Sequence, residues 1–228
     1  MAVYTAINDP SAHILTQLYT GNGSGTHAIT NDANAGNFKP DYLWIKQRSQ
    51  GSRNHNNWDS SRGNSQRIQA NSSGAEETQT NDQKTFDTDG FTVGSGNIVN
   101  ENSQTFVAWQ WKANGGTTSS NSSGSITSTV QANTTAGFSI VTYTGTGSNA
   151  TVGHGLGVAP DQVIIKARER SDNWRMGSHK LTSWGYNIAL DVDNAEWANA
   201  GVFNSTGPTS TVFYVGTDGA TNASGEGY

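Results

Sequence analysis

Residues 38–48 read FKPDYLWIKQR, and residues 158–168 read VAPDQVIIKAR. In both stretches a Pro-Asp step leads into a run of apolar residues that closes with Lys-x-Arg, and Pro40 and Pro160 lie 120 residues apart. Short runs rich in aromatic and β-branched residues favour β-strands over helices. The sequence therefore predicts one strand in each of the two stretches.

Two further blocks repeat around these stretches, in the same order. YTGNG at residues 19–23 is matched by YTGTG at 143–147, and FTVG at 91–94 is matched by FYVG at 213–216. Glycine and asparagine clusters between the blocks mark turns, and long helical periodicity is absent. We therefore predict an all-β fold made of two tandem, related β-sandwich domains of jelly-roll-like character, a scaffold that presents surfaces.

The proposed boundaries follow the repeat. Residues 1–18 form an N-terminal arm with a short helical turn at 11–17, residues 19–113 form the first repeat, residues 114–124 form a flexible linker, and residues 125–228 form the second repeat. Strands are expected at residues 17–20, 42–48, 91–93, 105–112, 125–132, 138–143, 184–191 and 211–215, and at Phe203.

The alternation within the strands predicts which faces are buried. In the first repeat Leu43 and Ile45 lie on one face, and Tyr42, Trp44 and Lys46 lie on the other. In the second repeat residues 163–165 are apolar on both faces, which is typical of a central strand of a sandwich.

The two repeats differ at their ends. The first continues after Phe106 with VAWQWK at residues 107–112, an alternating run that predicts a half-buried strand, whereas the sequence gives the second repeat no equivalent after Tyr228. That strand would come from residues outside this sequence, from another subunit, or not at all. Because unpaired strand edges favour pairing with another chain, we expect a fragment of a longer protein or a subunit of an assembly.

Composition narrows the classes of partner. The chain has 228 residues, of which 14% are charged, and a formal net charge of −5 without a basic stripe, so nucleic-acid binding is not expected. It has no cysteine, and no apolar run approaches the roughly 20 residues that a membrane helix needs, so we expect no disulfide and no membrane insertion. Residues 1–9 do not resemble a signal peptide.

Catalytic and metal-binding patterns are weak. The five histidines (His13, His27, His55, His154 and His179) show no ligand spacing, and His154, between two glycines, is expected to hydrogen-bond to a turn. Candidate acid pairs are Glu76 with Glu77, Asp87 with Asp89, and Asp191 with Asp193 and Glu196, and all fit turns or loops. We therefore predict no enzyme activity, no catalytic residue, no cofactor and no metal site. Calcium at residues 87–90 or 191–194 stays open as an alternative.

Four tryptophans are the candidate glycan contacts. Trp58 and Trp174 follow polar loops at similar places in the two repeats, and Trp184 and Trp197 lie among Ser, Gly and Asn. An exposed indole ring can stack on a sugar, whereas a buried one completes a core. Both interpretations are open for each residue.

The shared blocks, the DGFTVG turn at residues 89–94, the VAWQWK run at 107–112 and the DPSA opening at 9–12 resemble the repeated domain of uncharacterised structural proteins of tailed-phage virions. The segment VGHGLGVAP at 152–160 is similar to a turn of phage fibre domains. The resemblance covers nearly the whole chain. It implies a tail-fibre, tail-appendage or capsid-decoration subunit, located in the virion after assembly in the host cytoplasm, with other virion subunits and copies of itself as partners. A glycan-binding host-attachment module is the alternative, and a polysaccharide-degrading tailspike enzyme is a further one.

Overall fold

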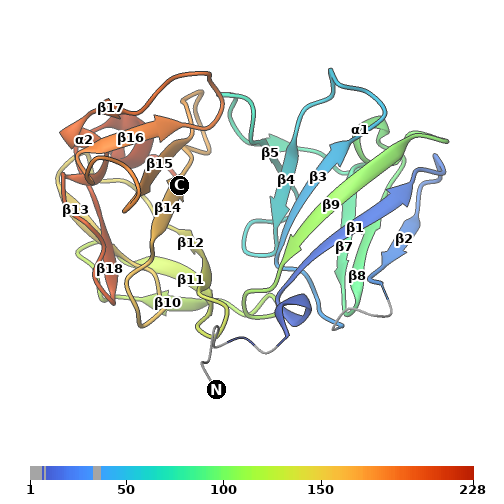
Figure 1. The fold of residues 1–228 in the computed structure, drawn as a ribbon, viewed down its shortest axis with the longest axis horizontal. Helices are drawn as coiled ribbons and strands as arrows, with labels where there is room; N and C mark the ends of the chain where they lie inside the picture. Colours follow the sequence, from blue (N-terminus) through green and yellow to red (C-terminus); the bar gives the residue numbers. More distant parts are fainter. Residues whose placement is uncertain (1–6, 8, 33–36) are drawn as a thin grey trace. The chain divides into compact units, whose positions relative to one another are not determined.

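The computed structural model of the chain describes residue 7 and residues 9–32 and 37–228. Strands make up 39% of the chain and helices 7%, and the strand pairs run antiparallel apart from one isolated bridge (Figure 1). The predicted all-β fold class is confirmed.

The chain divides into two compact units whose boundaries interleave in the sequence. The first unit takes the described residues up to 67 together with residues 77–117 and 133–138, and the second takes residues 68–76, 118–132 and 139–228. Residues 68–76, from the middle of the first repeat, thus belong with the second unit. Within the expected linker, residues 119–121 form a short strand that pairs in the second unit.

The elements that lie wholly or mainly in the first unit are η1 (Pro10–Ala12), β1 (Ile14–Thr20), β2 (His27–Thr30), β3 (Tyr42–Gln47), β4 (Asn56–Asp59), β5 (Gly63–Gln69), β6 (Glu77–Thr78), β7 (Gln83–Asp87), β8 (Gly90–Val93), α1 (Asn97–Asn100) and β9 (Thr105–Trp111). Six strands form one sheet in the order β1-β9-β3-β4-β5-β6, and three form a second sheet in the order β2-β8-β7. Strand β9 is central, because it pairs with β1 on one side and β3 on the other.

The helical turn expected at residues 11–17 is wrong for most of its length. A 3₁₀ turn covers only Pro10–Ala12, where the Asp9 carboxylate accepts a hydrogen bond from the Ser11 N–H at 3.0 Å. Strand β1 begins at Ile14 and pairs with β9 over all seven residues, and this ladder outweighs local helix preference. Residues 1–6 and 8 of the predicted arm lie outside the described residues.

The core of the first unit lies on the inner face of the six-stranded sheet. Strand β3 alternates as predicted, with Leu43 and Ile45 fully buried and Tyr42, Trp44 and Lys46 half-buried on the opposite face. The core cluster consists of Ile29, Leu43, Ile45, Trp58, Phe91, Val93, Val99, Phe106 and Ala108. Its members come from both sheets, which therefore pack as a sandwich-like pair of layers.

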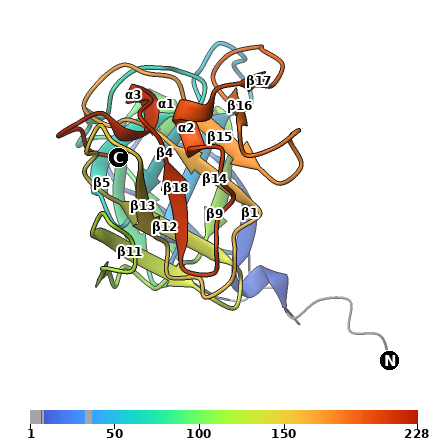
Figure 2. The same ribbon diagram turned by 90° about the vertical axis from the view of Figure 1, so that its left-hand side faces the viewer.

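The elements of the second unit are β10 (Ser119–Asn121), β11 (Ser128–Asn133), β12 (Phe138–Thr142), β13 (Ala150–Gly153), β14 (Gln162–Ile165), β15 (Arg175–Ser178), β16 (Tyr186–Ala189), β17 (Trp197–Ala198), α2 (Ala200–Phe203), β18 (Val212–Val215) and α3 (Gly219–Asn222). They form three sheets, in the orders β10-β11-β12, β13-β18 and β14-β15-β16-β17. The β13-β18 pair is seen side by side in Figure 2.

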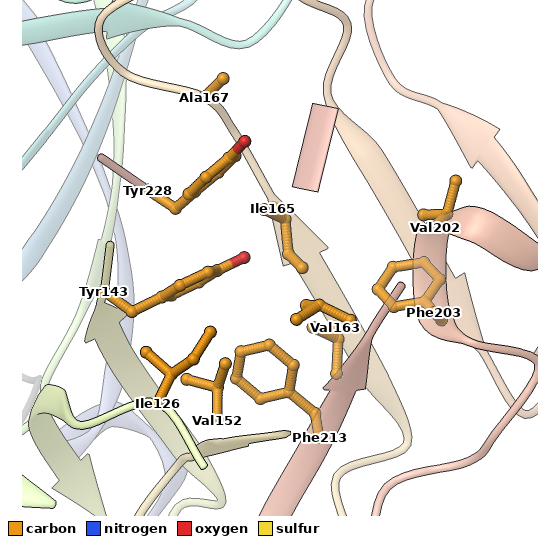
Figure 3. Packing of buried hydrophobic residues seen from close by; sticks show 11 residues of the cluster. Ile126, Tyr143, Val152, Val163, Ile165, Ala167, Val202, Phe203, Phe213 and Tyr228 are labelled. Atoms are coloured by element: carbon orange, nitrogen blue, oxygen red, sulfur yellow. The ribbon is translucent and has the colours of Figure 1, made fainter. Parts of the chain in front are cut away.

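The core of the second unit is a separate cluster of Ile126, Tyr143, Val152, Val163, Ile165, Ala167, Val202, Phe203, Phe213, Val215 and Tyr228. Figure 3 shows the rings of Tyr143 and Tyr228 stacked above one another beside Ile165 and Phe213. The two rings have centroids 5.0 Å apart and planes 14° apart. Each unit therefore buries its own apolar cluster.

Two strand predictions fail in the second unit. Phe203 lies in helix α2, where the Asn199 side chain caps the helix by accepting a hydrogen bond from the Gly201 N–H at 3.0 Å. Strand β14 is an edge strand, with Ile164 45% exposed, although its sequence predicted a central position.

The same tyrosine and asparagine contacts occur in both units. In the first, the Tyr19 hydroxyl donates to the Val99 carbonyl at 2.7 Å, and Asn100 Nδ2 donates to the Gly94 carbonyl at 2.9 Å. The Asn22 N–H donates to Asn100 Oδ1 at 2.9 Å. We call this set of contacts the Asn100 clamp.

The second unit repeats this arrangement as the Asn222 clamp. The Tyr143 hydroxyl donates to the Thr221 carbonyl at 2.6 Å, Asn222 Nδ2 donates to the Gly216 carbonyl at 2.7 Å, and the Thr146 N–H donates to Asn222 Oδ1 at 2.8 Å. Both asparagines are fully buried and satisfy backbone groups of the turns that follow the YTG motifs.

Candidate functional site

Trp58 and Trp174, two of the four candidate glycan contacts, are buried. Trp58 has no exposed surface and lies in the core of the first unit. Trp174 is 6% exposed, and its indole N–H donates to the Gln69 carbonyl at 2.9 Å within the second unit. Neither ring offers a free face to a sugar in this structure.

The two tryptophans also occupy different places in their sheets. Trp58 stands opposite Leu43, whereas the residue opposite Val163, the counterpart of Leu43, is Gly177. A Cβ atom on Gly177 would come within 2.7 Å of both Phe203 and Trp184. The expectation that Trp58 and Trp174 are equivalent is therefore wrong, and Trp184 and Phe203 cover the site that Trp58 fills in the first unit.

Trp184 and Trp197 are half-buried and serve packing. The Trp184 ring meets Phe203 edge-on, with centroids 5.7 Å apart. The Arg175 guanidinium lies 5.1 Å from the centroid of the Trp197 ring, a cation–π contact. The cationic Arg175 side chain therefore covers one face of the Trp197 ring.

A different set of rings gathers on the outer face of the six-stranded sheet. We define the ring face as Tyr42, Trp44, His55, Trp109, Trp111 and Phe138, all residues of the first unit. Register brings them together, because Trp44 stands opposite Trp109 and Tyr42 stands opposite Trp111 across β3 and β9. The alternation in YLWIK and VAWQW places the aromatic residues of each strand on one face. Only the pairing of β3 with β9 brings the rings of the two strands next to one another.

Trp44, His55 and Trp109 form the centre of the ring face. The Trp44 and Trp109 centroids lie 5.8 Å apart with planes at 71°, and His55 stacks on Trp109 at 6.5 Å and 8°. The Trp44 N–H donates to His55 Nδ1 at 2.9 Å, so this nitrogen is an acceptor. Burial, and then the charge of Lys46, lower the pKa of His55, which favours the neutral ring.

Exposed apolar residues and a small pocket adjoin the ring face. Ile14 and Leu18 on edge strand β1 are 44% and 54% exposed, and Ile14 stands opposite Trp111. A pocket of about 240 Å³ is lined by Ile7, Pro10, His13, Ile14, Trp111, Ala136, Gly137 and Phe138. Its lining is mostly apolar, so it suits an apolar group better than a charged one.

The candidate carboxylates are engaged in structural contacts. Asp87 accepts hydrogen bonds from the hydroxyls of Thr85 and Thr92 at 2.6 and 2.7 Å. Glu76 forms an ion pair with Arg168 at 2.8 Å. These contacts engage oxygens of both carboxylates in bonds that hold the local structure together.

Glu77, Asp191 and Glu196 show the same use. Glu77 pairs with Arg67, and Asp191 accepts a hydrogen bond from the Trp174 N–H at 3.1 Å. Two hydrogen bonds from Thr182 lower the pKa of Glu196.

The histidines are likewise placed in local contacts. His154 is 2% exposed, its Nδ1 accepts a hydrogen bond from the Leu156 N–H at 3.2 Å, and its Nε2 lies 3.2 Å from the Thr209 carbonyl, which confirms its expected role in a turn. The described part of the chain contains no cluster of three or more His, Asp or Glu residues suited to a metal ion. It also has no helix that is long and apolar enough to span a membrane.

Comparison with known proteins gives a family but no activity. Residues 9–228 match the family model described as a domain of unknown function, DUF7483, and the chain belongs to that family. No curated protein and no solved structure matches the chain.

Proposed function

We propose that the chain is a structural subunit of a phage particle, of the tail-fibre, tail-appendage or decoration type. It acts by assembling with other subunits and with copies of itself, and it carries out no catalysis. The support from sequence is the resemblance of its repeated blocks to virion structural proteins.

The observation that carries the proposal is the exposed edge strand β1. It is seven residues long, lies at the end of the six-stranded sheet, and exposes Ile14 and Leu18 beside the ring face. Edge strands with apolar residues pair readily with other chains unless charges or bulges protect them. Strand β1 carries no charged residue.

Self-association of the purified chain tests this proposal. Leu18→Lys places a charge on the exposed edge, and sedimentation velocity is expected to show association weakened by at least about tenfold. Val192→Lys is the matched control, because it places the same charge on an exposed apolar residue outside strand β1. Mass spectrometry of purified phage particles should also detect the chain.

A monomer at every concentration, together with absence from the particles, would overturn the assembly role. Glycan binding is the alternative that the ring face favours, because Trp44 and Trp109 present half-buried indole surface on the outer face of the sheet. Retention on a polysaccharide column that is lost in Trp109→Ala would move the conclusion to attachment. Shortening of the polysaccharide on incubation would move it to hydrolysis.

A further inference from the structure

The position of strand β9 in the first unit defines what a complete sheet looks like. Strand β9 lies between β1 and β3 and runs antiparallel to both. At its start, the Arg48 N–H donates to the Thr105 carbonyl at 2.7 Å, and the Gly21 N–H donates to the Gln104 carbonyl at 2.8 Å. One extended segment thus satisfies backbone groups on both sides.

Residues 226–228 begin the same arrangement in the second unit. The Arg168 N–H donates to the Gly227 carbonyl at 2.9 Å, the Gly145 N–H donates to the Glu226 carbonyl at 2.8 Å, and Tyr143 and Tyr228 exchange backbone hydrogen bonds at 3.3 and 2.9 Å. Past this point β12 and β14 are both sheet edges, and no described strand lies between them. We call the position between Ser139–Thr142 of β12 and Gln162–Ile165 of β14 the strand slot.

The backbone directions of the two edges suit an incoming strand. Asp161 accepts from the His179 N–H at 3.1 Å on the β15 side, and successive residues of a strand direct their N–H and C=O groups to opposite sides. Gln162 and Ile164 therefore point theirs into the strand slot. On the other edge Val141 shares the direction of Tyr143, which already pairs with Tyr228.

An aspartate that both repeats share behaves differently in the two units. Asp41 is fully buried, and its carboxylate accepts the N–H groups of Ala113 at 2.7 Å and Gly115 at 2.8 Å, directly after β9. Its counterpart Asp161 has a side chain that is 85% exposed. Asp161 thus lacks, among the described residues, the backbone segment that Asp41 holds.

We infer that the strand slot accepts an added antiparallel β-strand with the chemistry of β9. The donor is an extended segment with small or uncharged residues at alternate positions facing the core, as Ala108 and Gln110 do in β9. Insertion would place β14 in the interior of a sheet, the position that its apolar sequence fits. Asp161 would then hold the two N–H groups that follow the strand.

A synthetic peptide with the sequence of residues 107–115, VAWQWKANG, tests this inference on the purified chain. Calorimetric titration is expected to show one-to-one binding, and amide hydrogen exchange is expected to slow in β12 and β14. Ile164→Pro removes an N–H that points into the slot while sparing the bonds to β15, and it should weaken binding by at least about tenfold. A peptide in which Ala108 is replaced by Lys should bind equally poorly, independently of how any chain variant folds.

Asp161→Ala provides the sharper test. It should weaken the 107–115 peptide about fivefold and leave the shorter 107–111 peptide unchanged, because only the longer one reaches the carboxylate. Asp193→Ala, which removes an exposed carboxylate elsewhere in the second unit, is the matched control. Equal effects of Asp161→Ala on both peptides would exclude the capping role.

Two outcomes would overturn the inference. In the first, neither the free peptide nor the same residues fused after Tyr228 protect β12 and β14 from exchange. In the second, the peptide in which Ala108 is replaced by Lys binds as tightly as the parent peptide, so that the slot does not select a strand with the chemistry of β9. Both measurements use the isolated chain, so a negative result here is distinct from absence of the protein from particles, which bears on the proposed function.

Discussion

The two units share a polar framework and fill their cores differently. Each clamp lies within its own unit. The Asn100 clamp and the Asn222 clamp hydrogen-bond to equivalent backbone groups at equivalent positions of the two repeats. Opposite Leu43 stands the buried Trp58, whereas opposite Val163 stands Gly177, covered by Trp184 and Phe203. Buried backbone groups must be paired one by one, whereas apolar volume can be supplied from any neighbouring element. The polar clamps are therefore the part of the repeat that both units keep, and the apolar residues of the core are the part that can be exchanged.

The largest expected effect comes from the position at which the units differ. Trp58→Ala should lower the free energy of unfolding of the first unit by about 4 kcal/mol, because it leaves a cavity the size of an indole. Gly177→Ala should destabilise the second unit by about 2 kcal/mol through overpacking against Phe203 and Trp184. Hydrogen exchange read separately for peptides of each unit, during urea unfolding, measures both.

Trp197→Ala serves as the control for the loss of an indole outside the apolar clusters. A Trp58→Ala variant as stable as the parent would show that this ring is not the counterpart of the Trp184–Phe203 pair.

The clamps provide the next test, at positions where the units agree. Asn222→Ala removes two donors and one acceptor from backbone groups that the buried side chain satisfies, and it should cost about 3 kcal/mol in the second unit. Asn100→Ala should cost a similar amount in the first unit. Hydrogen exchange measured during urea unfolding should assign each loss of stability to its own unit.

Asn114→Ala is the matched control, since this asparagine is exposed. Unequal losses from the two clamps, by more than a factor of two, would contradict their equivalence.

The smallest expected effect is a pH dependence confined to one unit. Burial lowers the pKa of His154 below its ordinary value of 6.5, so the unfolded chain binds a proton more readily than the folded unit does. Stability from this group is complete above about pH 7 and falls as the pH drops below 6.5, by up to about 1 kcal/mol at pH 5.5. Urea midpoints measured at the two pH values should show this loss.

His154→Gln keeps a donor and an acceptor without a titrating ring, and it should flatten the dependence.

Local pattern predicted the elements better than it predicted their neighbours. The alternation of residues 42–47 predicted both the strand and its buried face, and YTG followed by glycine predicted the turns. The apolar run at 163–165 gave the strand but not its edge position, because the pattern of one strand does not show whether a second one pairs with it.

The candidate site was harder to predict for the same reason. Trp58 and Trp174 follow similar polar loops, which fit either an exposed ring or a ring in the core, and both rings are buried. The ring face was missed because its members come from β3, β9, the first residue of β12 and one loop, and sheet register brings the four rings of β3 and β9 into contact.

The sequence by itself determined that the chain is all-β, that the same blocks occur twice in the same order, and which residues of the strongest strand face inward. These properties depend on neighbours along the chain and on the two-residue period of a strand. Tertiary structure alone decided that Trp58 is replaced by a covered glycine in the second unit, that Asp161 is exposed where Asp41 is buried, and that β12 and β14 are both sheet edges. Each of these depends on pairing between segments far apart in the chain, and the energy of such pairing is a property of the whole sheet.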